Sequence, residues 1–533
     1  MVKRVKKSLA RLKVEAEAVP ARLKQPQTPD QAYRELFHDV QTAQLHVDSK
    51  TFVDAVPLAR RREILKAYEA QRYQPDFDLM QFVATHFQAD HTHDAFREPS
   101  TDHDMSGHIT ALWDGLRRHP LKNSGSLIAT PYAYTVPGGR FNELFYWDSY
   151  FIALGLVADG RLADAEGILR NFAYMIRRFG YIPTANRTYL TSRSQPPFFA
   201  HLARLIATYK GRRVLVRYLP YLLAEYRFWM RGTSKLRGND SMTAYRRVVR
   251  MPDGTILNRY FDDESAPRPE SYPEDLETAE QAAERQATQV FLDVRAAAES
   301  GWDFSSRWLR DGRSLSTIHT TELVPVDLNC LLYQLELTIA EAYKALRQKL
   351  LHERFTRAAH RRADAIRRYC WSDKDGFFFD YDIVAQAQSP QMTLAGVFPL
   401  YAGIATTEQA ALLSAVLEKH FLKPGGVVTT LADSGQQWDA PNGWAPLQLV
   451  TICGLRRYGY DSLADEIRRR WLACNQLIFD DRHKMVEKYD VVHPGAVAGG
   501  GEYVLQDGFG WTNGVAQALI KEDDMLRKAM TEI

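Results

Sequence analysis

The fold is indicated most clearly by the stretch LGLVADGRLADAEGILRNFAYMI (154–176), which has apolar residues three and four apart around Gly160. This spacing is typical of amphipathic helices, and the glycine marks a tight turn between two of them. A second stretch, CGLRRYGYDSLADEIRRRWLACNQLI (453–478), follows the same plan with Gly459 at its turn. Both stretches therefore predict helical hairpins.

Most of the chain after Asp148 has the same helical spacing, and strand-like runs are few. Repeated helical hairpins can close into an α/α toroid, whose loops line a pit at one end, or remain an open solenoid. The loops are rich in aromatic and charged residues, which favours the closed, all-α toroid. We expect a flexible basic tail over 1–29 and a single toroidal domain over 30–533, with 30–110 as an accessory layer of helices and loops.

Composition narrows the class of protein. The 533 residues are 45% hydrophobic and 25% charged, as in ordinary globular proteins. The net charge of +3 does not suggest a nucleic-acid partner, and no run of 18 apolar residues suggests a membrane span. Residues 1–24 hold eight Lys or Arg and two Glu without the apolar segment of a secretory signal. The four cysteines form no CxxC pair. We therefore predict a cytoplasmic protein, expected to be a monomer.

Chemistry concentrates in the run PGGRFNELFYWDSYF (137–151), which combines six aromatic residues with Arg140, Glu143 and Asp148. Flat rings beside charged hydrogen-bonding groups suit a polar ligand with apolar faces, such as a sugar. Similar mixtures recur at NRTYLTSRSQPP (186–197), RPESY (268–272), ESGWDFSSRW (299–308), QQWDAPNGWAP (436–446), MVEKYD (485–490) and GGGEYVLQDGFGWTNG (499–514). Most contain Gly or Pro, which indicates loops or helix ends that can converge on one pit.

Glycoside cleavage requires two carboxyl groups, an acid for the leaving oxygen and a second that activates water or attacks directly. Asp303 follows Gly301 and Trp302, and a neighbouring apolar ring would raise the pKa of its carboxyl group. Glu487 precedes a glycine-rich run. Composition alone does not select these two from 65 acidic residues. Four histidines between 91 and 108 have no metal-ligand spacing, so no metal or cofactor is expected.

The runs PGGRFNELFYWDSYF and QWDAPNGWAP resemble the two signatures of the trehalases, glycoside hydrolase family 37. The segments LFHDVQTAQLHVDSKTFVDAVP (36–57) and GGGEYVLQDGFGWTNGV are also similar to that family, so the resemblance covers most of the chain. It implies an (α/α)6 toroid that hydrolyses the disaccharide α,α-trehalose to two glucose molecules with inversion. It assigns the general acid to Asp303 and the general base to Glu487, at the separation of about 6.5–9.5 Å that inversion requires.

The resemblance and the motif runs also indicate which residues contact the sugar. We expect substrate contacts from Arg140, Phe141, Trp147, Asp148, Asn186, Arg193, Ser194, Gln195, Arg268, Glu270, Gly301, Trp438 and Glu502. Gly499–Gly501 are expected to form a mobile lid that carries Glu502.

The chain departs from the family pattern at three positions. Phe145 replaces a usual Tyr, Thr184 an Asn that contacts sugar, and Val504 a Pro. None is the assigned acid or base, so affinity and lid rigidity are affected more than the reaction type.

The rival hypotheses are a toroidal enzyme acting on a different glucoside or epimerising a free sugar, a non-catalytic sugar sensor, and a helical-repeat scaffold. The signature runs contain no histidine, which disfavours an epimerase, and both carboxylates are present, which disfavours a sensor.

Overall fold

The computed structural model describes residues 26–89, 103–236 and 242–531. Most of the expected basic tail lies outside these residues, as do His91 and His93. Helices dominate the described chain and enclose the main hydrophobic core. Within this part of the chain, no helix is long and apolar enough to cross a membrane.

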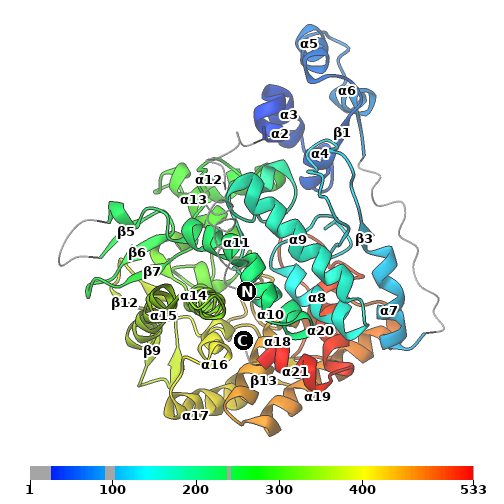
Figure 1. The fold of residues 1–533 in the computed structure, drawn as a ribbon. Coiled ribbons are helices and arrows are strands. Elements are labelled where there is room, and N and C mark those ends of the chain that lie inside the picture. Colours follow the sequence, from blue (N-terminus) through cyan, green and yellow to red (C-terminus); the bar gives the residue numbers. More distant parts are fainter. Residues whose placement is uncertain (1–25, 90–102, 237–241, 532–533) are drawn as a thin grey trace, which may run out of the picture.

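Helices of the inner layer pack each against the next and close a ring (Figure 1). Within the described residues these are α8 (Asp148–Ala158), α10 (Phe199–Lys210), α14 (Val326–Ala345), α16 (Phe398–Ala402), α18 (Ala445–Arg457) and α20 (Gly510–Ile520). They are apolar on several sides because they have neighbours on several sides. In α8, for example, every residue from Asp148 to Val157 is buried. Closure of the ring confirms the all-α toroid and rules out the open solenoid.

Helices of the outer layer alternate with the inner ones along the chain. They are α7 (Met105–Gly115), α9 (Leu162–Phe179), α11 (Arg213–Trp229), α15 (Lys349–Cys370), α17 (Thr407–Val416) and α19 (Asp461–Arg482). The two hairpins expected from the glycine turns are α8–α9 and α18–α19, and both form. Gly160 and Gly459 have φ of 72° and 80° at these turns, a backbone conformation that favours glycine.

Other helices surround this double ring. Before α14 the chain forms a 3₁₀ turn (Pro269–Ser271), α12 (Tyr272–Gln281) and α13 (Ala287–Ser300), and α21 (Asp524–Thr531) packs against α10 and α18. An N-terminal layer, defined here as residues 29–88, contains α2 (Pro29–Tyr33), α3 (Glu35–Thr42), α4 (Lys50–Asp54), α5 (Arg61–Gln71) and α6 (Leu79–His86). In Figure 1 these blue helices lie at the top, outside the ring. They share a separate hydrophobic cluster with Tyr189 and Leu190 of the main domain.

The strands are short, antiparallel and confined to connections. The pairs are β1 (Val56–Pro57) with β2 (Phe87–Gln88), β3 (Arg117–Arg118) with β4 (Tyr134–Thr135), β9 (Trp371–Ser372) with β10 (Phe377–Phe378), β13 (Leu422–Lys423) with β14 (Gly426–Val427), and β15 (Asn442–Gly443) with β16 (Tyr489–Asp490). The three-stranded sheets are β5 (Thr243–Tyr245), β6 (Val248–Arg250) and β7 (Ile256–Asn258), and β12 (Ala387–Gln388), β11 (Tyr381–Asp382) and β8 (Leu323–Val324). The β15–β16 pair matters for function because it joins the segment around Trp438 to the segment that carries Glu487.

Candidate active site

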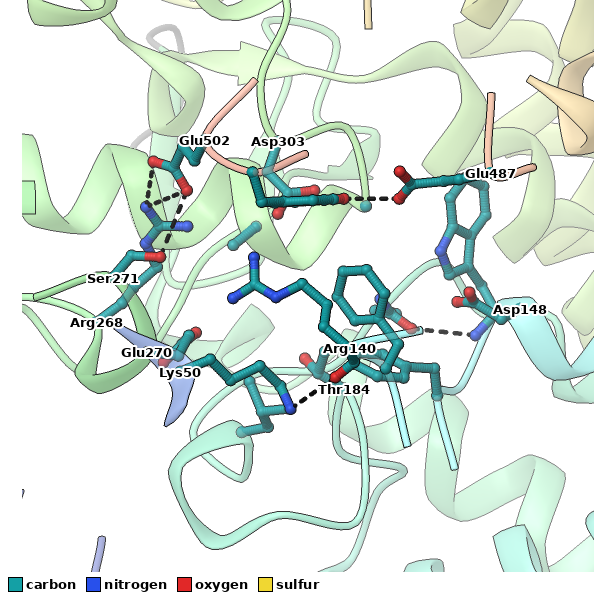
Figure 2. Close-up of a pocket in the computed structure, with 18 of the residues that line it drawn as sticks. Lys50, Arg140, Asp148, Thr184, Arg268, Glu270, Ser271, Asp303, Glu487 and Glu502 are labelled. Atoms are coloured by element: carbon teal, nitrogen blue, oxygen red, sulfur yellow. Dashed lines mark hydrogen bonds and ion pairs between the residues drawn. The ribbon is translucent and has the colours of Figure 1, made fainter. Parts of the chain in front are cut away.

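A cavity gathers side chains from loops and helix ends that are distant in the sequence. Its lining consists of Lys50, Arg140, Phe141, Phe145, Trp147, Asp148, Thr184, Tyr189, Leu190, Arg193, Gln195, Arg268, Glu270, Ser271, Ala298, Gly301, Asp303, Trp438, Trp444, Glu487, Glu502, Tyr503, Phe509 and Trp511. Figure 2 shows Arg140, Asp303 and Glu487 turned toward its middle, with Arg268 near one end and Asp148 near the other.

Asp303 is placed by the end of α13. Gly301 terminates this helix with φ of 73°, and a Cβ atom there would lie 2.8 Å from Cε2 of Trp147. The helix end can approach the indole ring only because this residue is glycine. Burial raises the pKa of Asp303 to about 7, although the nearby charge of Arg268 acts in the opposite direction. The carboxyl group can therefore hold a proton near neutral pH.

Glu487 occupies a different environment in the same cavity. Tyr503 Oη donates a hydrogen bond of 2.7 Å to its Oε1, and Lys488 Nζ lies 3.6 Å from its Oε2. Burial raises the pKa of Glu487, while the charge of Lys488 and the hydrogen bond from Tyr503 lower it. Among the described residues Oε2 has no hydrogen-bond partner.

Asp148 is a third carboxyl group in the cavity, and its side chain is buried. Burial raises its pKa to about 8, with further raising contributions from the charges of Glu487 and Asp303. A carboxyl group with such a pKa is protonated at neutral pH and can donate a hydrogen bond as well as accept one.

Two arginines on one side of the cavity are fixed by carboxylates. Arg268 donates to Asp275 through Nε and Nη2, at 3.0 and 2.7 Å from Oδ1, and its Nη2 also lies 3.1 Å from Glu502. Arg193 donates to Glu270 at 2.5 Å. In the described structure Arg193 Nε and Nη1 and Glu270 Oε2 are buried without hydrogen-bond partners. Arg193 Nη1 also lies 3.5 Å from Asp262 Oδ2, so Arg193 Nε and Glu270 Oε2 are the groups left for hydroxyl groups of a ligand.

Arg140 is held from the N-terminal layer and from the C-terminal loops. Its Nη2 donates to Asp48 at 2.7 Å, its main-chain N–H donates to Gln506 at 2.8 Å, and its guanidinium lies 4.6 Å from the ring centre of Tyr503. Lys50 Nζ donates to the carbonyl oxygen of Arg140 at 3.1 Å. The N-terminal layer therefore helps to form the cavity wall.

Stacked tryptophans form an apolar wall. Trp438 lies face to face with Trp444, with ring centres 3.9 Å apart, and stacks on Trp302 at 5.3 Å. Trp147 and Trp511 pack edge to face beside them at 5.5 Å. Rigid rings of this kind can pack against the C–H faces of a sugar.

The structure brings most of the predicted substrate residues to the lining, but not Asn186 and Ser194. Asn186 Nδ2 donates to the carbonyl oxygen of Ile128, and its Oδ1 accepts from the N–H of Leu144. Ser194 Oγ donates to the carbonyl oxygen of Ile182. Both side chains are buried within the loop framework, so their polar groups satisfy main-chain atoms.

Several lining residues were not predicted, among them Lys50 and Tyr503. Lys50 lies four residues before Asp54, a spacing that alone indicates an ordinary helical ion pair. Its burial and its 3.0 Å contact with Glu143 come from tertiary packing. Tyr503 directly follows Glu502 in a run already associated with the site, which was the available signal.

The described residues contain one group of three side chains close enough to share a metal ion, His319, Glu322 and Asp382. None of them lines the cavity, and Arg310 already pairs with Glu322.

Buried carboxyl groups, arginines and stacked aromatic rings in the cavity of an all-α toroid define the class as glycoside hydrolase. Comparison with known proteins identifies the family. A family model described as Trehalase matches residues 44–523. Periplasmic trehalases of Salmonella paratyphi B and Salmonella agona are each 46% identical over 497 residues, which cover 93% of this chain and 86% of theirs. The chain therefore belongs to the trehalase family and is an α,α-trehalase.

Solved structures with a similar fold include a trehalase. The neutral trehalase from Saccharomyces cerevisiae is similar with a TM-score of 0.59 and 27% identity, covering 80% of this chain and 81% of that one. An uncharacterized conserved protein from Thermus thermophilus is similar with a TM-score of 0.50 and 17% identity, covering 78% of this chain and 99% of that one. The second likeness shows the fold alone.

The prediction of a cytoplasmic location is wrong, because the similar curated relatives are named periplasmic trehalases. The prediction relied on the basic first residues and on the unpaired cysteines. All four cysteines are buried and free. Burial protects a thiol in either compartment, so free cysteines do not determine the location.

Proposed function

We propose that the chain hydrolyses α,α-trehalose by inversion, with Asp303 as general acid and Glu487 as general base. The observation that carries the proposal is that both carboxyl groups line one cavity but have different partners. Inversion needs one carboxyl group that holds a proton and a second that accepts a proton from water.

The surroundings of Asp303 favour the role of acid. A pKa of about 7 leaves a large protonated fraction near neutral pH, so the group can protonate the oxygen that links the two glucose units. The main chain that carries this carboxyl group is fixed by the end of α13 at Gly301 and by a hydrogen bond from Gln437 Nε2 to the carbonyl oxygen of Asp303.

The surroundings of Glu487 favour the role of base. Lys488 and Tyr503 stabilise its ionised form, and its Oε2 remains available to accept a proton from a water molecule. That water attacks the anomeric carbon of one glucose, while Asp303 releases the other glucose as the leaving group.

The remaining polar groups would bind the sugar hydroxyls. Arg140 Nε, Arg193 Nε and Glu270 Oε2 lack hydrogen-bond partners in the described structure, and each residue lines the cavity. Protonated Asp148 adds a donor, and Gln195 is held beside it by N–H groups of residues 146 and 147. A site with fixed polar partners discriminates strongly against ligands that lack the matching hydroxyls.

We also propose that the N-terminal layer belongs to one catalytic domain spanning 30–533. The contacts of Asp48 with Arg140 and of Lys50 with Glu143 support this arrangement. Ser49 Oγ also donates to Glu274 of α12 at 2.9 Å.

Product stereochemistry tests the mechanism. Inversion at one anomeric carbon of α,α-trehalose releases one β-glucose and one α-glucose, whereas retention releases two α-glucose molecules. We expect proton NMR of the first products, recorded before mutarotation, to show both anomers in equal amounts. Initial release of α-glucose alone would overturn the inverting assignment.

A further inference from the structure

Tyr503 is the one lining residue whose hydroxyl group reaches a proposed catalytic carboxylate in the described structure. Its Oη lies 2.7 Å from Glu487 Oε1. Because this bond occupies Oε1, the oxygen without a hydrogen-bond partner is Oε2, which lies 3.6 Å from Lys488 Nζ. A base needs one oxygen directed at its water molecule, and fixing the other oxygen determines that direction.

The phenol itself is held in place. Its ring packs edge to face on Phe141 with ring centres 5.4 Å apart, and the cations of Arg140 and Lys488 lie 4.6 and 5.4 Å from its centre. Burial and the charge of Glu487 raise the pKa of Tyr503 well above its usual value. The hydroxyl group therefore stays protonated and remains a donor.

Tyr503 enters the cavity as part of the segment 499–503. The other residue with a side chain in this segment, Glu502, makes its contacts near Arg268. Glu502 accepts from Arg268 at 3.1 Å and from Ser271 Oγ at 3.4 Å (Figure 2). The segment rests closely on residues 435–437. A Cβ atom on Gly500 would lie 2.7 Å from the carbonyl oxygen of Gly435, and Gly500 has φ of 85°.

We propose that Tyr503 is a positioning residue for the general base, and that seating of segment 499–503 orients Glu487 and engages Arg268 in one event. The proposal rests on the proposed function, because it assumes that Glu487 is the base. It goes further by assigning a role to a residue that touches the base from the glycine-rich segment.

The substitution Tyr503→Phe tests the proposal because it keeps the ring and removes only the hydroxyl group. Loss of a hydrogen bond to the ionised form raises the pKa of Glu487, so the acidic limb of the kcat/KM profile should move to higher pH, by about one unit. We expect kcat at the optimum to fall about 10- to 100-fold, with KM little changed.

Tyr489→Phe is a matched control. Tyr489 Oη accepts a hydrogen bond of 3.2 Å from the N–H of Val486. Removing this hydroxyl group perturbs the main chain next to Glu487 but leaves the contacts of the Glu487 carboxylate unchanged. This variant should lower Tm and leave the acidic limb in place, whereas Tyr503→Phe should move the limb with little change in Tm. An unmoved limb in Tyr503→Phe, or equal shifts in both variants, would overturn the proposal.

Gly500→Ala tests whether the two contacts form together. The added Cβ displaces the segment, so KM should rise and the acidic limb should shift as in Tyr503→Phe. A rise in KM with an unmoved limb would show that the two contacts are independent. Glu487→Gln separates this proposal from the mechanism, because retained activity in that variant would overturn the base assignment itself.

Discussion

The acid side of the cavity, residues 301–304, and the base side, residues 486–488, each hold a carboxyl group away from water, but they surround it with different charges and donors. Glu487 is buried and Asp303 is half-buried, and removal from water raises the pKa of each carboxyl group. Glu487 also has a hydroxyl donor at 2.7 Å and the cation of Lys488 beside it. Asp303 is influenced by Arg268 and, in the opposite direction, by the charge of Glu502.

This difference shows how one apolar pocket can supply both an acid and a base. Desolvation alone would leave both carboxyl groups protonated. On the base side, burial raises the pKa of Glu487 but Lys488 and Tyr503 counteract part of that rise, whereas the acid side has opposing charges around it. Pairs of titratable groups in unequal surroundings are the usual basis for acid and base roles.

The largest expected effect comes from removing either carboxyl group. Glu487→Gln and Asp303→Asn should each lower kcat on trehalose by about 10²- to 10⁴-fold, with smaller effects on binding. On α-glucosyl fluoride, whose leaving group needs no proton, Asp303→Asn should recover activity and Glu487→Gln should not. Steady-state kinetics with both substrates would check this.

Glu225→Gln is a suitable control for this pair. Glu225 is a buried carboxyl group whose pKa burial raises to about 8, but it does not line the cavity. Its variant should retain activity within a few fold. If α-glucosyl fluoride restores activity to both active-site variants, or to neither, the proposed roles of Asp303 as acid and Glu487 as base are wrong.

An intermediate effect is expected from Arg140→Lys, whose side chain packs on Tyr503 near the base. Lysine keeps the positive charge but loses the fork that spans two oxygens, so KM should rise about tenfold while the pH limbs stay in place. Arg469→Lys is the control, because Arg469 is exposed and pairs only with Glu466 in the described structure. Equal KM values for the two variants would remove Arg140 from the site.

A smaller effect is expected from Glu502→Gln, which changes charge on the acid side. The wild-type basic limb should fall near pH 7, because Asp303 must keep its proton and its pKa is about 7. The charge of Glu502 helps to raise that pKa, so its removal should move the basic limb to lower pH. The acidic limb should not move. A basic limb displaced to higher pH would contradict this account.

The smallest effect is expected where the chain departs from the family pattern. Phe145 and Thr184 line the cavity, and the hydroxyl group of Thr184 already donates to the carbonyl oxygen of Ser194 at 2.8 Å. We expect Phe145→Tyr and Thr184→Asn to change KM by less than about threefold each, since neither touches the acid or base. A change in kcat comparable to that of Tyr503→Phe would show that these positions act on the chemistry.

Much of the fold could be predicted because helical periodicity and glycine turns are local signals. The hairpins α8–α9 and α18–α19 form where their glycines place them. Many site residues could also be anticipated, since they lie in motif runs with unusual composition. Asn186 and Ser194 lie in such a run too, but point into the loop framework. Sequence spacing does not tell which side of an irregular loop faces a cavity.

The sequence by itself determined an all-α toroid, a sugar-binding type of composition and the motifs of a family. Periodicity, glycine position and motif identity are properties of neighbouring residues. Tertiary structure alone decided that Lys50 of the N-terminal layer reaches the cavity, that Tyr503 bonds Glu487, and that Asp303 has a pKa of about 7. These features depend on burial and on contacts between segments far apart in the chain, and both arise only when the ring has closed.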